Sequence, residues 1–325
     1  QYITPTSTGN AIDFGDRTVS GSFVAGVTSP TRTCFGGAFT PSVSNIIDFV
    51  EIATTGNATD FGDLTTALRN STGCSSSTRG VFMGGRTPSS LQQLEFITIA
   101  SQGNATDYGD LLLAGYDYAG TSNSVIGFAA GGNTPSSTNS NVIQNFTIAN
   151  GGNTVDFGDL VLGRNSSASN SAAHGGLNDG YQGTRPIPFQ EVGGDTGLLL
   201  GGEGSSSFER INEITISSTG NASDFSGVDV SAFDTDGSSG KTRAFAITGA
   251  SGPAGTQQIS YVEFRNKGTF ADFGDATVTR QGCGAGANNT RLVAAGGGTP
   301  SNTNVIDYII MASIGNAADF GDLSV

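Results

Sequence analysis

The sequence contains no tryptophan, a single histidine and three cysteines, and its lysines are only Lys241 and Lys267. One histidine cannot supply the ligands of a histidine-based metal centre. Cys34, Cys74 and Cys283 are an odd number without CxxC spacing, so neither a disulfide framework nor a zinc site is predicted. We therefore expect three buried free thiols.

Charged residues are also scarce, at 13% of the chain, and the net charge of −14 with a pI near 4.2 is strongly acidic. Such a surface repels phosphate backbones, which excludes most nucleic-acid binding. No apolar run approaches the roughly 20 residues that span a bilayer, and no charged-then-apolar leader is present. We expect no membrane insertion. Because the chain starts at Gln1, we also expect that a segment upstream was removed or is not included.

What the chain has in abundance is glycine, 50 of 325 residues, together with 20 phenylalanines. This composition predicts a globular protein with many turns and a substantial core. One acidic phrase, DFGD or a close variant, recurs seven times at steps of 47, 47, 49, 68, 48 and 47 residues. The longest step carries an inserted loop at about 163–194. The aromatic residues of the phrase are Phe14, Phe61, Tyr108, Phe157, Phe225, Phe273 and Phe320.

Each repeat contains further parts in a fixed order. A small, polar stretch is followed by a short apolar run that ends in paired glycines, as in VFMGG. A TPS turn follows in four units, at Thr40, Thr87, Thr134 and Thr299. An alternating run such as LEFITI then precedes the phrase, and a period of two is typical of a strand. No segment has helical periodicity, so we predict an all-β protein.

Four short strands per repeat favour a β-propeller over a solenoid. We predict six full four-stranded blades and an N-terminal half-blade or clasp at 1–16, with a ring of seven as the close alternative. In the seven-bladed case, the half-blade takes its inner strands from a continuation beyond Val325 or from elsewhere. The expected first to sixth units span about 17–63, 64–110, 111–159, 160–227, 228–275 and 276–325.

These features resemble kelch-type propeller repeats, whose blades carry a double glycine after the second strand and an aromatic residue at the start of the fourth. Phenylalanine or tyrosine stands here where kelch repeats usually carry tryptophan. Units reading TRGVFMGG, TPSS and TGNATDFGDL further resemble repetitive virion or tail-fibre proteins of marine cyanophages. This resemblance covers nearly the whole chain and implies a location on a virion exterior or outside cells.

The phrase itself has two interpretations. As a structural joint, its first Asp accepts backbone N–H bonds, its glycine adopts a positive φ, its aromatic residue packs between blades and its second Asp caps the next strand. As a site, its paired carboxylates would bind calcium. Seven copies favour the joint, because a reactive pair is needed only once. The candidate calcium ligands are Asp60, Asp63, Asp107, Asp110, Asp156 and Asp159.

Two other groups of residues carry hypotheses. Arg32, Arg79, Arg243 and Arg291 recur before the glycine run, which predicts a belt of Arg–Asp contacts between neighbouring units. The inserted loop is either a lid or a recognition loop for a glycan or host surface. Its candidate recognition residues are His174, Asn178, Asp179, Tyr181, Arg185 and Phe189.

No nucleophile motif or phosphate loop accompanies His174, so we expect no enzyme activity and no cofactor other than the calcium alternative. The function predicted from sequence is a non-enzymatic, virion-associated propeller on a phage tail fibre or capsid exterior. It would serve as a scaffold or host-attachment element, with other virion proteins and a host-surface glycan as partners. The alternatives are a secreted bacterial carbohydrate-binding propeller and a calcium-stabilised adhesion repeat.

Overall fold

The computed structural model describes residues 1–123, 125–171, 196–200, 210–227, 235–240, 242–251, 254–266, 268–288, 290–298 and 301–324. Throughout these ranges the regular structure is β-strand, and no helix occurs in them. The strands form five antiparallel sheets. The all-β prediction is therefore confirmed.

Four of the sheets each belong to a single repeat. The first contains β1 (Ala25–Thr28), β2 (Arg32–Phe39), β3 (Val43–Glu51) and β4 (Thr59–Leu68). Another contains β13 (Ala168–Ser171), β14 (Thr196–Leu200), β15 (Arg210–Thr215) and β16 (Ser223–Gly227). The next contains β17 (Asp236–Ser239), β18 (Arg243–Ile247), β19 (Ala250–Ser251), β20 (Ala254–Glu263) and β21 (Ala271–Arg280). In this sheet β20 pairs with β18, β19 and β21, whereas in the other three the strands pair in the order of the chain. The last contains β22 (Gly284–Ala287), β23 (Arg291–Ala295), β24 (Val305–Ile310) and β25 (Ala318–Asp322).

The remaining sheet has eight strands because β9 is long enough to belong to two repeats. Its first part pairs with β8, and its second part pairs with β10. The eight strands are β5 (Thr72–Ser75), β6 (Arg79–Met83), β7 (Arg86–Thr87), β8 (Ser89–Thr98), β9 (Thr106–Ser122), β10 (Ile126–Asn133), β11 (Val142–Thr147) and β12 (Val155–Asp159).

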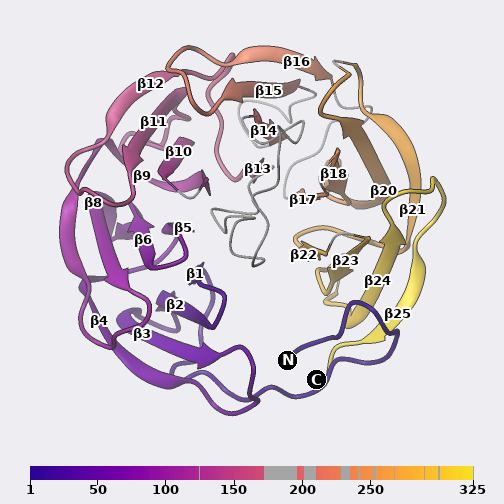
Figure 1. Cartoon of the computed structure of the whole chain (residues 1–325), viewed down its shortest axis with the longest axis horizontal. Helices are drawn as coiled ribbons and strands as arrows, with labels where there is room; N and C mark the ends of the chain where they lie inside the picture. The colour runs from indigo at the N-terminus through magenta and orange to yellow at the C-terminus, as the bar shows by residue number, and fades with distance from the viewer. Residues whose placement is uncertain are drawn as a thin grey trace, which may run out of the picture.

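Figure 1 shows these sheets around a central region, with the first strand of each repeat toward the middle and the phrase-bearing strand outside. Along the inside, β1 contacts β5, β5 contacts β9, β9 contacts β13, β13 contacts β17 and β17 contacts β22. The two chain ends lie side by side in Figure 1, and the Ser324 N–H donates to Gln1 Oε1 over 2.9 Å. Segments 323 positions apart in the sequence thus meet.

The core lies between neighbouring sheets and is built from the alternating apolar positions of the strands. One cluster joins Val27 and Phe61 of the first unit to Phe82 and Ile99 of the second. Paired glycines end the second strand with positive φ, as at Gly84 and Gly85 with φ of 60° and 107°, which side chains rarely adopt. The three cysteines are free and buried, as predicted. No helix in the described ranges is long and apolar enough to cross a membrane.

Candidate functional site

The DFGD phrase is the recurring feature that any function must explain. In the second unit the first carboxylate folds back on its own backbone, since Asp107 Oδ1 accepts the Gly109 N–H over 3.1 Å. Asp13, Asp272 and Asp319 accept from the corresponding glycines over 2.9 to 3.0 Å. The predicted Asx-type turn is confirmed at these four phrases.

The aromatic residue of the phrase is an anchor for the core. Phe61 is 3% exposed and meets Phe49 edge to face, with ring centroids 5.7 Å apart. Tyr108 meets Phe96 of its own unit and also Phe146 of the next unit, at 5.4 and 5.7 Å. Such edge-to-face pairs add to the free energy of area burial. Among the seven aromatic residues, Phe14 alone is only half-buried.

Three hydrogen bonds join a phrase to the next unit at every phrase except the degenerate one at Phe225, and we call this set the outer joint. At the joint between the first and second units, the Phe61 and Asp63 carbonyls each accept a backbone N–H, from Gly103 and Ala105, over 2.8 Å. The Asp63 N–H donates to Asn104 Oδ1 over 3.1 Å. The same side-chain bond recurs from Asp16 to Asn57, Asp110 to Asn153, Asp159 to Asn221 and Asp275 to Asn316.

The glycine of the phrase makes this close approach sterically accessible. Gly62 has φ of 147°, and a Cβ at this position would lie 2.5 Å from the carbonyl oxygen of Gly103. A side chain at Gly62 would therefore be strained and would push the two units apart. The spacing of the phrase, with glycine between its aromatic residue and its second Asp, follows from this contact.

The series of outer joints returns to the N-terminal segment. The Gly9 and Ala11 N–H groups donate to the carbonyls of Phe320 and Asp322, each over 2.6 Å. The Asp322 N–H donates to Asn10 Oδ1 over 3.1 Å. After the degenerate phrase at Phe225, a backbone bond from Phe270 N–H to the Gly227 carbonyl takes the place of the joint. Residues 9–16 thus hold a position between the sixth and first units.

A second set of contacts lies inside the joints and involves a buried polar residue on the third strand of each unit. Glu95 is 1% exposed and accepts the Thr65 N–H over 3.1 Å as well as the Thr65 hydroxyl. Gln144 Oε1 accepts the Leu112 N–H over 2.8 Å, and Asn212 Oδ1 accepts the Val161 N–H over 2.8 Å. Burial raises the pKa of the Glu95 carboxyl. Sequence reasoning missed this position because its residue type changes from unit to unit.

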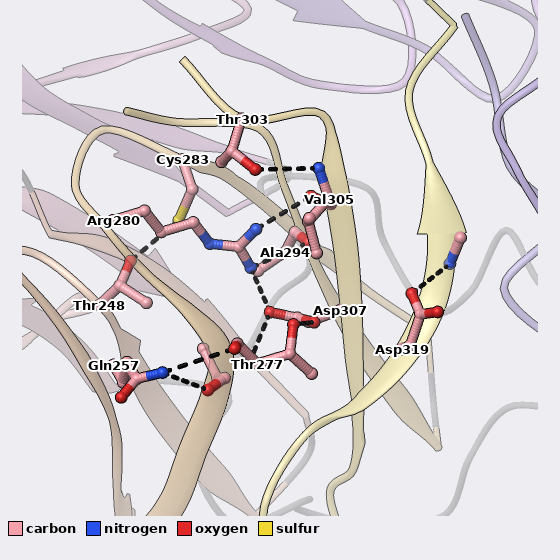
Figure 2. A network of polar contacts seen from close by, with 12 residues as sticks. Thr248, Gln257, Thr277, Arg280, Cys283, Ala294, Thr303, Val305, Asp307 and Asp319 are labelled. Atoms are coloured by element: carbon pink, nitrogen blue, oxygen red, sulfur yellow. Dashed lines mark hydrogen bonds and ion pairs between the residues drawn. The ribbon is translucent and has the colours of Figure 1, made fainter. Parts of the chain in front are cut away.

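Figure 2 shows a version of this contact that includes an ion pair, in the sixth unit. Arg280 is 0% exposed and forms an ion pair with Asp307 over 2.8 Å. Its guanidinium also donates to the carbonyls of Val305 and Ala294 over 2.9 and 3.3 Å. Thr277 donates to the same carboxylate through its N–H and its hydroxyl. The Asp307 carboxylate is therefore fully engaged in holding strands together.

The predicted belt of Arg–Asp contacts is wrong in its acceptors. Arg32 donates to the carbonyls of Ile99 and Ala100 in the next unit. Arg79 likewise donates to the carbonyls of Ile148 and Ala149 in the unit after its own. Arg243 donates to the carbonyl of Met311, and Arg291 donates to that of Pro5. The arginines do bridge neighbouring units, but backbone carbonyls replace the phrase carboxylates.

Each of these arginines also stacks on an aromatic ring of its own unit. The distances from guanidinium carbon to ring centroid are 4.6 to 4.8 Å, onto Phe49, Phe96, Tyr261 and Tyr308. Such stacking fixes the guanidinium plane against the neighbouring unit.

The other predicted site residues are placed as follows. Asp60, Asp107, Asp110 and Asp156 are exposed, and Asp63 and Asp159 are half-exposed. No group of three or more His, Cys, Asp or Glu side chains suited to a metal ion occurs in the described ranges. The loop candidates His174, Asn178, Asp179, Tyr181, Arg185 and Phe189 lie outside the described residues.

No protein-family model matches this sequence, and the search of curated proteins found no match. Functional inference therefore rests on the contacts described above.

Proposed function

We propose that this chain is a non-enzymatic β-propeller scaffold carried on the exterior of a phage virion, as part of a tail fibre or the capsid surface. The observation that carries the scaffold proposal is the outer joint, because the phrase's repeated polar groups are used to connect neighbouring units. A reactive site would instead require one unit to differ from the rest in its titratable groups.

Two features support a propeller of six full blades with an additional half-blade. Successive innermost strands contact one another from β1 to β22, while the phrase-bearing strands lie on the outside (Figure 1). The outer joints run in order along the chain and return from Asp322 to Asn10. In a solenoid each repeat contacts only its neighbours, so the last repeat would not contact the first.

The raised pKa values of the three cysteine thiols support a non-enzymatic role. Burial raises the pKa of the Cys34 and Cys74 thiols to about 12, and it also raises the pKa of Cys283. A thiol with so high a pKa carries almost no thiolate at neutral pH and is a poor nucleophile. These cysteines are packing residues.

The virion location is supported by the resemblance of the repeat units to cyanophage virion and tail-fibre proteins. An acidic, lysine-poor surface over a repeated β core also suits a particle component exposed to water. In such a particle, the ring would present several equivalent edges to other virion proteins, and attachment to a host-surface glycan would use the exposed loops.

Quantitative mass spectrometry of gradient-purified particles tests the location. The expected result is a fixed number of copies per particle, in constant ratio to the major capsid protein across gradient fractions. Recovery of the chain only in the particle-free medium would reject the virion proposal and favour a secreted protein.

A glycan array probed with the full chain separates scaffolding from host attachment. A plain scaffold gives no glycan signal above that of an unrelated acidic protein of similar size. A reproducible signal for one glycan class would assign host attachment.

A further inference from the structure

Six of the seven phrases belong to a unit that has first and second strands, whereas the N-terminal phrase belongs to a segment that has neither in the described ranges. The first and second strands of the units are β1 and β2, β5 and β6, β9 and β10, β13 and β14, β17 and β18, and β22 and β23. The N-terminal segment, residues 1–16, takes part in two outer joints, with the first and the sixth units, and has one isolated bridge between Tyr2 and Ile12. No first or second strand pairs with this segment within the described ranges.

The first unit shows what such a missing pair leaves uncovered. Ile52 is 45% exposed, whereas the matching side chains Ile99, Ile148 and Ile216 are 0%, 1% and 0% exposed. Ile99 belongs to the cluster that packs on the preceding unit, whereas the segment before the first unit carries no inner strands in the described part of the chain on which Ile52 could pack. The difference is therefore one of position in the ring.

Phe35 gives the same result on the glycine strand of the first unit. It is half-buried, whereas its counterpart Phe82 is 2% exposed and lies against Gly36 of the preceding unit. A Cβ on Gly36 would lie 2.7 Å from the Phe82 ring. The glycine strand of one unit therefore packs directly against the aromatic ring of the next unit. In the described ranges no glycine strand lies against Phe35, whose ring is contacted instead by the Arg17 guanidinium, 5.4 Å from the ring centroid.

The opposite wall and the outer end are also open. In β22 of the sixth unit, Gly284, Gly286 and Ala287 are exposed, whereas Cys74 and Ser75 of β5 are buried. Phe14 and Ile3 of the N-terminal segment are only half-buried, although matching residues such as Phe61 and Ile97 are 3% and 2% exposed. We call the surface bounded by Ile3, Phe14, Phe35, Ile52 and β22 the open seat.

The charge pattern of the repeat specifies what fits there. An arginine at the start of a glycine strand donates to backbone carbonyls of the next unit, as Arg32 does to Ile99 and Ala100. The matching carbonyl of the first unit is that of Ile52, whereas the four repeat arginines donate to the carbonyls of Ile99, Ile148, Met311 and Pro5. An occupant that carries arginine before its apolar run would supply this bond.

We propose that the open seat binds a two-stranded β segment with the repeat's own inner-strand pattern, namely a small, polar strand followed by Arg, an apolar run and paired glycines. The segment adds to the edge of residues 1–5 by main-chain pairing and places its apolar run over Phe35 and Ile52. This is a binding site for a partner strand pair, and it is independent of whether the chain is carried on a virion.

The probe is a labelled peptide with the sequence of residues 69–86, which contains β5 and β6, added to the full chain and followed by fluorescence anisotropy. Saturable binding is expected. Ile52→Asp should weaken it about tenfold or more, because a charge would be buried under the apolar run. Val155→Asp is the matched control, since Val155 is 56% exposed on another unit, and it should leave binding unchanged. Binding that is equal in both variants would overturn the proposal.

A second experiment tests the same proposal without a free peptide, in case the peptide aggregates or does not fold alone. The same sequence is joined after Val325, and the labelling rate of an Ile52→Cys thiol is compared with that in the chain without the extension. The native cysteines are buried, so we expect them to react slowly. We expect labelling to slow about tenfold or more, as a buried thiol is shielded. An unchanged rate, or equal protection by an extension of scrambled sequence, would contradict the proposal.

Discussion

Replacing Gly62 with alanine tests the outer joint at its tightest point. The residue has φ of 147°, in a region that side chains rarely adopt, which costs roughly 1–3 kcal/mol for a non-glycine residue. The new Cβ would lie 2.5 Å from the Gly103 carbonyl oxygen, so the neighbouring backbone must move.

This movement strains the hydrogen bonds from Gly103 N–H to the Phe61 carbonyl and from Asp63 N–H to Asn104. Each bond contributes about 1 kcal/mol. Together, strain and lost bonds predict a decrease of about 2–5 kcal/mol in the free energy of unfolding. With an unfolding entropy of about 2.1 cal/mol/K per residue, the melting temperature should fall by roughly 3–7 °C.

The matched control is Gly103→Ala, on the other side of the same joint. Gly103 has a similar φ of 155°, but a Cβ there meets nothing within 4 Å. Urea denaturation of both variants isolates the contribution of the close approach, because backbone strain is common to the two. The explanation is refuted if the two variants lose equal stability, or if Gly62→Ala lies within about 0.5 kcal/mol of the unmodified chain.

Four further substitutions or treatments follow from the same contacts. Asn104→Ala removes the acceptor of the Asp63 N–H and should cost about 1 kcal/mol in urea denaturation, whereas a value near zero would show that the bond is dispensable. Arg280→Met leaves the Asp307 carboxylate buried without its ion-pair partner and should cost about 3–5 kcal/mol, and the double change with Asp307→Leu should recover part of this loss in the same assay. Because burial raises the folded-state pKa of Glu95, its protonated form contributes stability that is present below the unfolded-state pKa and is lost as pH rises through the folded-state value. Glu95→Gln, which copies Gln144 of the third unit, should therefore be more stable than the unmodified chain near pH 7 and lose that advantage near pH 4, as measured by melting temperature against pH. The Cys34 and Cys74 thiols, with pKa raised to about 12, should react with a disulfide reagent only when the chain unfolds, and rapid reaction of the folded chain would contradict their burial.

The repeat and its strands could be predicted because they depend on local patterns. The alternation in LEFITI predicts β8, and glycine in the phrase predicts the positive φ found at Gly62. The turn of the first Asp onto its own glycine is also local, since only two positions separate Asp107 and Gly109.

The contacts between units could not be predicted in the same way, because they join residues about one repeat apart. Asn104 had a visible signal, since an asparagine recurs just before most phrases, but its partner Asp63 belongs to another unit. The arginines were assigned carboxylate acceptors because side-chain charges are visible in a sequence, whereas the carbonyls they bind are present in every residue. The buried polar position was hidden because Glu95, Gln144 and Asn212 differ in type while they accept equivalent N–H groups.

The central claim is that the acidic phrase is a structural joint whose series returns to its own start. Native-state hydrogen exchange, followed by NMR at residue level, tests it most directly at Gly9, Ala11 and Asp322. The account predicts that these three amides are protected to a similar degree as Gly103, Ala105 and Asp63, their counterparts in the interior of the series. Exchange at the rate of an open chain end for all three, with the interior amides protected, would contradict it.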